Sequence, residues 1–162
     1  RSCLVGSEMC IRDSIECGSL DIYPLWDKDS EKKLQYISTA LLSMGFASRV
    51  PHAQGAREGK FSKTILQDDS RIIVFWVDIF GILKDDELKL SITDPNGQII
   101  KSEQRVFTGS KGHHFQFLGK KSDGSKWPKG EYTARVELFR EDIGDIETII
   151  DSSTKVTVES PE

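Results

Sequence analysis

Hydrophobic and polar residues alternate with a period of two over much of the chain after Thr64. Such alternation places every second side chain on the same face of an extended strand, so it predicts strands that are buried on one side. The clearest case is the segment 87–93, where Leu88, Leu90 and Ile92 would share the buried face. We therefore expect this part of the chain to be built from strands.

One segment departs from the alternation, because residues 71–80 are apolar at nearly every position. A strand of this composition needs cover on both faces. We predict a central strand that packs against the opposite sheet on one face and against the segment preceding Thr64 on the other. Trp76 is its largest side chain, and we assign it a structural role.

Turn signals separate the predicted strands. Asp94-Pro95-Asn96-Gly97 combines a proline of fixed φ with an Asn-Gly pair that tolerates positive φ, so it predicts a tight turn in which Gly97 is structural. The pairs Asp68-Asp69 and Asp85-Asp86 flank the first long strand and are interpreted as turn residues that stop edge pairing. Further strands are expected at 98–107, 112–118, 133–139, 146–150 and 155–158.

Short strands with no long helix between them favour an antiparallel sandwich over a parallel α/β sheet. We predict an all-β, antiparallel, immunoglobulin-like (fibronectin-like) sandwich of six to seven strands at 64–162. Gly130 and Tyr132 open a late strand and resemble the tyrosine corner of such domains, in which the ring packs inward and the hydroxyl bonds the preceding loop. Both residues are therefore assigned structural roles.

The section 15–63 mixes Gly, Pro and Ser with charged residues, and we interpret it as a linker. Its apolar residues Leu34, Ile37, Leu41 and Met44 have the spacing of one helical face, and Gly45 follows where a C-cap would stand. The pattern predicts a short helix near 38–44, followed by a loop through the polar run 54–60.

Residues 1–14 are treated as an artefact and excluded from the fold, because Leu4 to Ser14 resemble a translated sequencing-adapter scar of the kind found in environmental assemblies. The chain begins with Arg and shows no signal-peptide pattern, so we expect its true amino terminus to be missing. Excluding this stretch leaves Cys17 as the single thiol. Two interpretations stay open for it, a disulfide to a cysteine further upstream and an unpaired thiol.

The charge balance excludes one class of partner. The chain carries 22 basic and 26 acidic residues, a net charge of -4, whereas a nucleic-acid-binding protein needs a basic face. The longest apolar run, 72–83, contains Asp78 and is too short for a membrane span, which needs ~20 residues. We expect neither nucleic acid nor a bilayer span.

Each candidate catalytic or metal-binding pattern lacks a residue, a spacing or a geometry that its chemistry requires. His113 and His114 are neighbours on a strand and point to opposite faces, so they cannot easily share an ion, and His52 stands alone. Asp27-x-Asp29-x-Glu31 lacks the glycine and distal glutamate of a calcium loop. The segment 55–62 is one residue short of a phosphate loop, and no GxSxG or HExxH motif occurs. We predict no catalytic, cofactor-binding or metal-binding residue.

Aromatic residues offer one alternative, because aromatic faces can stack on sugar rings. Burial in the core is the favoured role for most of them, and only Trp127 is singled out for ligand contact, since it lies in a loop beside Pro128. The aromatic residues considered are Trp76, Phe115, Phe117, Trp127 and Phe139.

A set of motifs in a fixed order carries a family resemblance. The set looks like the region that follows the catalytic domain in proteobacterial LytM/lysostaphin-type zinc metallopeptidases, which act on peptidoglycan, and it spans about 15–141. The motifs are Cys17-Gly18, Pro24-Leu25-Trp26, ALLSMGFA at 40–47 with Pro51, Phe75-Trp76, DDELKLSITDPNG at 85–97, and WPKGEY at 127–132.

The resemblance implies a periplasmic or extracellular protein whose zinc ligands come from HxxxD and HxH motifs, neither of which occurs in this chain. The chain would be the non-catalytic accessory domain of a truncated endopeptidase. Its implied partners are the missing upstream catalytic domain and a cell-wall glycan or envelope protein. The alternative is a free-standing polysaccharide- or protein-binding module.

Overall fold

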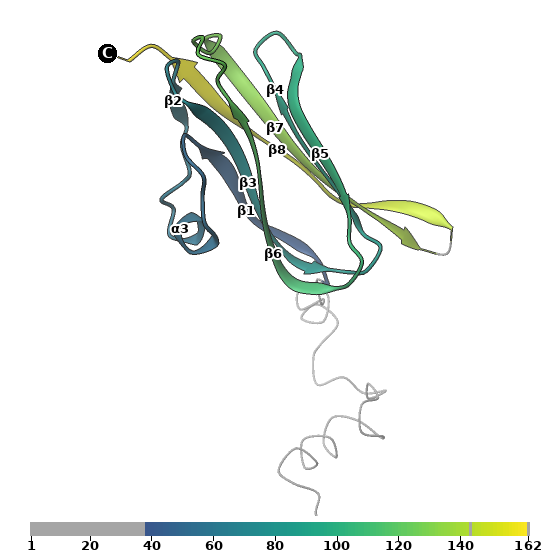
Figure 1. Ribbon diagram of the computed structural model, residues 1–162. Helices are drawn as coiled ribbons and strands as arrows, with labels where there is room; N and C mark the ends of the chain where they lie inside the picture. The colour runs from purple at the N-terminus through teal and green to yellow at the C-terminus, as the bar shows by residue number, and fades with distance from the viewer. Residues whose placement is uncertain (1–37, 143, 162) are drawn as a thin grey trace, which may run out of the picture. The chain divides into compact units, whose positions relative to one another are not determined.

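The computed structural model describes residues 38–161 apart from Ile143 (Figure 1). The stretch 1–14, Cys17 and the Asp27-x-Asp29-x-Glu31 pattern lie outside these residues. The elements are β1 (Ala40–Ala47), α3 (Ala53–Arg57), β2 (Ile65–Gln67), β3 (Ile72–Ile82), β4 (Glu87–Thr93), β5 (Ile99–Val106), β6 (Lys111–Lys121), β7 (Gly130–Asp142) and β8 (Asp145–Glu159).

The strands form two sheets that face one another (Figure 1). One sheet has three strands in the order β1-β3-β6, and the other has five in the order β2-β8-β7-β4-β5. The predicted all-β sandwich is therefore confirmed, but the described residues form eight strands where six to seven were expected. Every pairing in the described part is antiparallel except that of β2 with the end of β8, which is parallel.

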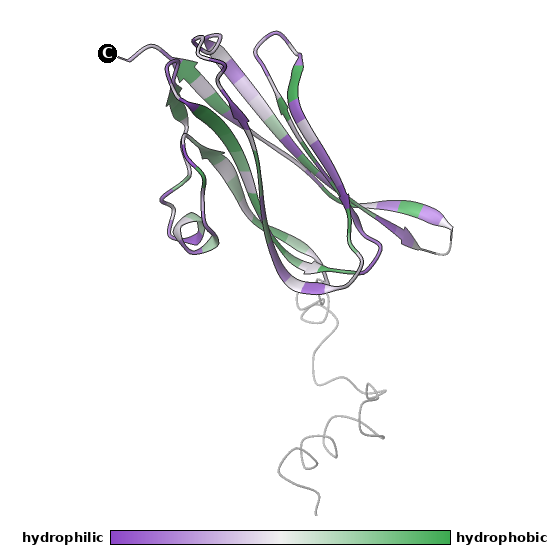
Figure 2. Cartoon of the chain, viewed as in Figure 1, coloured by the Kyte–Doolittle hydropathy of each residue, from purple (hydrophilic) through white to green (hydrophobic). Residues whose placement is uncertain are grey.

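The core between the sheets follows the predicted alternation. Leu88, Leu90 and Ile92 of β4 are all buried, while the residues between them are half-buried. Figure 2 shows strongly hydrophobic positions along β3 and mostly polar positions along β5, which is an edge strand. Polar side chains suit an edge strand because they discourage pairing with another chain.

The prediction for the apolar segment is confirmed, since β3 is the central strand of its sheet and is covered on both faces. Ile73, Phe75, Val77 and Ile79 belong to the core between the sheets. Val74 and Trp76, two of the alternate residues, belong to a separate cluster on the outer face.

The predicted helix near 38–44 is wrong, because Ala40–Ala47 is strand β1, paired with β3. The register shifts between Leu41 and Ser43, which inserts one extra residue as a β-bulge. Leu41 and Met44 therefore pack on the same core at a spacing of three, which a regular strand would not give. The bulge therefore produced the three-residue spacing that was interpreted as one face of a helix.

The predicted boundary at residue 64 is also wrong. Residues from Ser38 onward form one compact unit, so the supposed linker supplies a sandwich strand and the cover of its outer face. A short helix does occur in this section, but it is α3, inside the run that was expected to be a loop. Predicted strands 146–150 and 155–158 are parts of the single strand β8.

The turn between β4 and β5 is built as the sequence indicates. The Asp94 Oδ1 atom accepts hydrogen bonds from the backbone N–H groups of Asn96 and Gln98, at 2.9 and 2.8 Å. Gly97 has a φ of +83°. Gly130 has a φ of +130°, and a Cβ there would lie 2.9 Å from the side chain of Pro95, so glycine is needed on both grounds.

Candidate functional site

The outer face of the β1-β3-β6 sheet carries an apolar cluster centred on Trp76. The indole N–H of Trp76 donates to the carbonyl oxygen of Phe61 at 3.0 Å, and the ring stacks on Phe115 with centroids 5.9 Å apart. Gly45 lies beside the ring, since a Cβ there would be 3.1 Å from Trp76 Cζ2. Phe61 and Ala56 are buried in this cluster and close it from the helix side.

Asp78 of β3 lies on the same outer face and is 1% exposed. Arg57, the last residue of α3, donates from Nε to Asp78 Oδ2 at 2.9 Å. His113 on β6 contacts Asp78 Oδ1 through Nε2, and its Nδ1 lies 2.9 Å from Arg57 Nη2. These contacts tie α3 to two strands and place Arg57 and His113 against the buried carboxylate, whose Oδ1 accepts no hydrogen bond of regular geometry.

An aspartate beside a histidine raises the question of general-base chemistry. A catalytic histidine needs one ring nitrogen free to accept a proton from a nucleophile. Both ring nitrogens of His113 lie within hydrogen-bond distance of Arg57 Nη2, a group that can only donate, and Nε2 also contacts Asp78. The arrangement is therefore an ion-pair network that holds the helix and leaves no ring nitrogen for a substrate.

His113 and His114 lie on opposite faces of β6, as predicted. His114 is only 8% exposed, and its Nε2 lies 2.9 Å from Gln116 Oε1, while Gln116 Nε2 donates to Glu103 Oε1 at 2.8 Å. Burial lowers the pKa of His114, although the Gln116 hydrogen bond opposes this effect. His114 is thus a neutral packing residue at neutral pH.

Two phenylalanines stay exposed on the outer face. Phe80 on β3 is 39% exposed and Phe117 on β6 is 42% exposed, although Phe117 was expected in the core. Phe80 is opposite His113 in the ladder, so Phe80 borders the Asp78 network. Phe117 is opposite Trp76. The two rings lie on the same outer face, four ladder positions apart, and we call these two residues the exposed aromatic face.

Trp127 does not offer its ring to solvent, so the predicted role in ligand stacking lacks an exposed aromatic face. It is 8% exposed, and its indole N–H donates to the carbonyl oxygen of Ser70 at 2.6 Å. Its ring meets Tyr132 edge-on, with centroids 6.5 Å apart. The loop position of Trp127 suggested exposure, but the ring fills the end of the sandwich.

The Tyr132 hydroxyl donates to the carbonyl oxygen of Pro128 at 3.0 Å, which is the bond expected of a tyrosine corner. Burial, with a smaller effect from the charge of Asp94, raises the pKa of Tyr132 to about 12. The hydroxyl consequently keeps its proton and remains a donor.

Two of the predicted turn aspartates are buried structural groups. Asp86 is 0% exposed. Its Oδ1 accepts a hydrogen bond from Arg140 Nε at 2.7 Å, and its Oδ2 accepts one from Arg140 Nη2 at 2.8 Å. Asp68 is 1% exposed, and its Oδ1 forms an ion pair with Lys126 Nζ at 3.2 Å. Sequence reasoning missed both, because each basic partner is more than fifty positions away along the chain.

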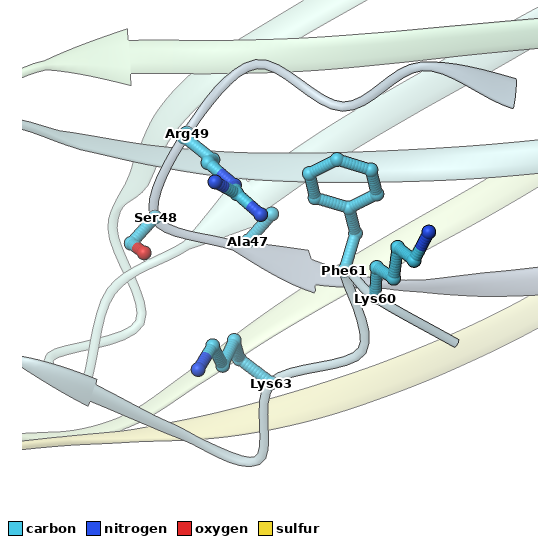
Figure 3. Close-up of a pocket in the computed structure, with 6 residues that line it drawn as sticks. All are labelled: Ala47, Ser48, Arg49, Lys60, Phe61 and Lys63. Carbon is cyan, nitrogen blue, oxygen red and sulfur yellow. The ribbon is translucent and has the colours of Figure 1, made fainter. Parts of the chain in front are cut away.

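A hollow of about 330 Å³ lies where β1 ends, and we call it the basic hollow (Figure 3). It is lined by Ala47, Ser48, Arg49, Lys60, Phe61 and Lys63. The Arg49 guanidinium carbon lies 5.1 Å from the centre of the Phe61 ring. Sequence reasoning missed this site because its basic residues stand in the section interpreted as a linker, and only the fold brings them together.

The described residues contain neither a metal-binding cluster nor a helix that could span a membrane. No group of three or more His, Cys, Asp or Glu side chains there is placed to hold a metal ion. In the same part of the chain, no helix has the length and apolar character to cross a bilayer. The segment 55–62, which resembles a phosphate loop in composition, contains the end of α3 and the Trp76 cover.

Comparison with known proteins supports the immunoglobulin-like character. The FlgD Ig-like domain family matches residues 84–142, which is less than half of the chain. No curated protein sequence matches the chain significantly.

Among solved structures, the C-terminal domain of wzt is similar at a TM-score of 0.51 and 10% identity, covering 77% of this chain and 75% of that chain. A CARDB domain from Pyrococcus furiosus has a TM-score of 0.41 and 12% identity, covering 83% of this chain and 98% of its own. CopC from Methylosinus trichosporium OB3b has a TM-score of 0.36 and 15% identity, with 76% and 96% covered. Identities this low concern the fold alone. The two-sheet topology and the match to the FlgD Ig-like domain family identify the described part as an immunoglobulin-like β-sandwich domain.

Proposed function

We propose that this domain is a non-catalytic accessory module of a periplasmic or extracellular zinc endopeptidase that acts on peptidoglycan. Its role would be to pack against the catalytic domain or to position that domain on a partner. The association with an endopeptidase rests on the ordered motifs from Cys17-Gly18 to WPKGEY at 127–132. The immunoglobulin-like sandwich supports the coarser part, an accessory or binding module.

The exposed aromatic face of the β1-β3-β6 sheet is the observation that carries the interaction role. Phe80 and Phe117 are 39% and 42% exposed, although both lie on strands of a sheet that is otherwise well covered. Burying such rings against a neighbour would remove apolar area from water at about 25 cal/mol per Å². Asp78, Arg57 and His113 supply a polar border beside Phe80.

A binding experiment tests this role. The upstream catalytic domain, once recovered, would be mixed with the full chain and with a Phe80→Ser, Phe117→Ser double variant. We expect the complex to weaken clearly in the double variant and to persist in Ile146→Ser, a control that alters a 74% exposed residue on β8. Equal binding by all three proteins would remove this face from the interaction.

The endopeptidase association has a separate test, which is the coding sequence upstream of Cys17. We expect an HxH zinc-ligand segment shortly before that position, and its absence would refute the association. The non-catalytic role is tested with the purified chain on peptidoglycan. Hydrolysis that a chelator abolishes would show that the chain is an enzyme.

The alternative of a free-standing polysaccharide-binding module relied on Trp127. Because Trp127 is buried, this alternative now lacks its aromatic platform. A glycan pull-down that loses signal with Trp127→Ala, in a variant shown to stay folded, would restore it.

A further inference from the structure

The basic hollow is positively charged, whereas the protein as a whole is negatively charged. The chain has a net charge of -4, yet three of the six residues that line the hollow are basic. They come from two separate segments, the turn after β1 and the segment that follows α3. The backbone N–H of Lys63 donates to the carbonyl oxygen of Phe46 at 2.9 Å, which joins the two walls.

Arg49 is an exposed residue whose guanidinium lies over an aromatic ring. Its guanidinium lies 5.1 Å from the centre of the Phe61 ring, and Figure 3 shows the side chain turned toward that ring. Phe61 is itself fixed, because it is 4% exposed, its carbonyl oxygen accepts the Trp76 indole N–H, and its ring meets His52 edge-on with centroids 5.2 Å apart. A guanidinium stacked in this way keeps its in-plane N–H donors available to a ligand.

The charges of the hollow are only partly compensated. Lys60 forms an ion pair with Glu58. Across residues 38–161 without Ile143, the ion pairs found include neither Arg49 nor Lys63. Within the described residues the hollow therefore has two basic groups outside any ion pair, Arg49 and Lys63, and both are exposed to solvent.

We propose that the basic hollow binds one oxyanion group, a carboxylate or a phosphate, carried by a molecule of about the size of a single sugar. Arg49 would supply paired N–H donors that match the planar oxygens, and Lys63 would supply a second positive charge. The volume of about 330 Å³ lies at the lower end of the range for small-molecule sites, ~300–1,000 Å³. This inference does not depend on the endopeptidase association or on the exposed aromatic face.

The test uses the full chain and three defined probes. Glucuronate carries a carboxylate, glucose 6-phosphate carries a phosphate, and glucose carries neither. Each is titrated while backbone amide NMR shifts are followed. We expect saturable shifts at Ser48, Arg49 and Lys63 with one or both anionic probes and none with glucose, and the stronger of the two identifies the oxyanion.

Variants separate a built site from general charge attraction. Arg49→Gln should weaken binding by about tenfold or more, since it removes a charge-assisted donor pair. Lys63→Gln should cause a smaller loss. Lys101→Gln is the matched control, because it removes one charge from an exposed residue of β5 in the other sheet.

Three results would overturn the proposal. The first is the lack of saturable shifts with either anion, and the second is equal binding of glucose. The third is an equal loss of affinity in Arg49→Gln and Lys101→Gln, which would mean that the probe responds only to net charge. Folding of each variant is checked by its amide spectrum, so a loss of affinity cannot be confused with unfolding.

Discussion

Individual side chains of β3 have different roles according to the face on which they lie. Trp76 points away from the main core, yet it is 1% exposed because α3 and Phe61 cover it. Asp78, two positions further, is equally buried and contacts Arg57 and His113. The outer face of this strand is thus buried from Val74 to Asp78, apolar at Trp76 and charged at Asp78, and it becomes exposed at Phe80.

Trp76→Ala should lower the free energy of unfolding by about 3–5 kcal/mol, because it empties the centre of the outer cluster and removes the hydrogen bond to Phe61. Chemical denaturation measures this loss. Phe117→Ala is the control, and we expect about 1 kcal/mol or less there, since Phe117 is 42% exposed. Equal losses would show that Trp76 is not buried as described.

His114 should make stability depend on pH. Its pKa is lowered in the folded protein by burial, so below about 6.5 the unfolded chain binds more protons than the folded one. The free energy of unfolding should therefore fall as the pH drops from 7 through 6.5 toward the folded pKa. The fall should be smaller in His114→Gln, measured by denaturation at a series of pH values. Parallel curves for the two proteins would contradict this role.

At the scale of elements, β1 and α3 depend on each other. The β-bulge of β1 turns Leu41 and Met44 into the main core and leaves Gly45 on the outer face, beside the Trp76 ring. α3 then covers that ring, and its last residue, Arg57, bonds Asp78 on β3. A five-residue helix would not be stable alone, so its order comes from this packing.

Gly45→Ala tests the contact between β1 and the covered ring. The new Cβ would lie 3.1 Å from Trp76 Cζ2, and Trp76 is held between Phe61 and Phe115, so the ring has little room to move. We expect a loss of about 1–3 kcal/mol, the usual range for overpacking. Gly112→Ala on β6 is the control, because nothing lies within 4 Å of its added Cβ, and its stability should change by about 0.5 kcal/mol or less. A neutral Gly45→Ala would show that the ring can shift.

At the scale of the whole molecule, one polar network joins the two sheets. Arg140 on β7 binds the buried carboxylate of Asp86, and its Nη2 also donates to Thr39 Oγ1 at 2.7 Å. Thr39, just before β1, donates in turn to the carbonyl oxygen of Gly81 at 2.6 Å. Hydrogen bonds to Asp86 and the closeness of the carboxylate raise the pKa of Arg140, although its own burial opposes this effect.

Arg140→Met should cost about 3–5 kcal/mol in unfolding free energy, because it leaves the Asp86 carboxylate buried without its charged partner. Arg135→Met is the matched control, since the Arg135 ion pair with Asp151 is exposed to solvent and such pairs contribute little to stability. Thermal and urea unfolding measure both. Similar losses for the two variants would mean that the network does not hold the sheets together.

The sequence by itself determined the strands from residue 72 onward and the turn between β4 and β5. A period of two in Leu88, Leu90 and Ile92 is a direct consequence of strand geometry, and the conformation of Gly97 is required by the turn in which it stands. The cover on both faces of β3 also followed from composition, because a strand apolar on both sides has no stable place at a surface.

Only the tertiary structure decided where β1 belongs, which aspartates are buried and which aromatic rings stay exposed. The bulge in β1 gives a helical spacing inside a strand, and Asp86 is buried because Arg140, far along the chain, reaches it. Trp127, expected to be exposed in a loop, is buried, and Phe117, expected in the core, is exposed. Both outcomes depend on which distant segments cover the ring. Local patterns report which side chains share a face, whereas the partners that cover each face come from distant segments that only folding brings into contact.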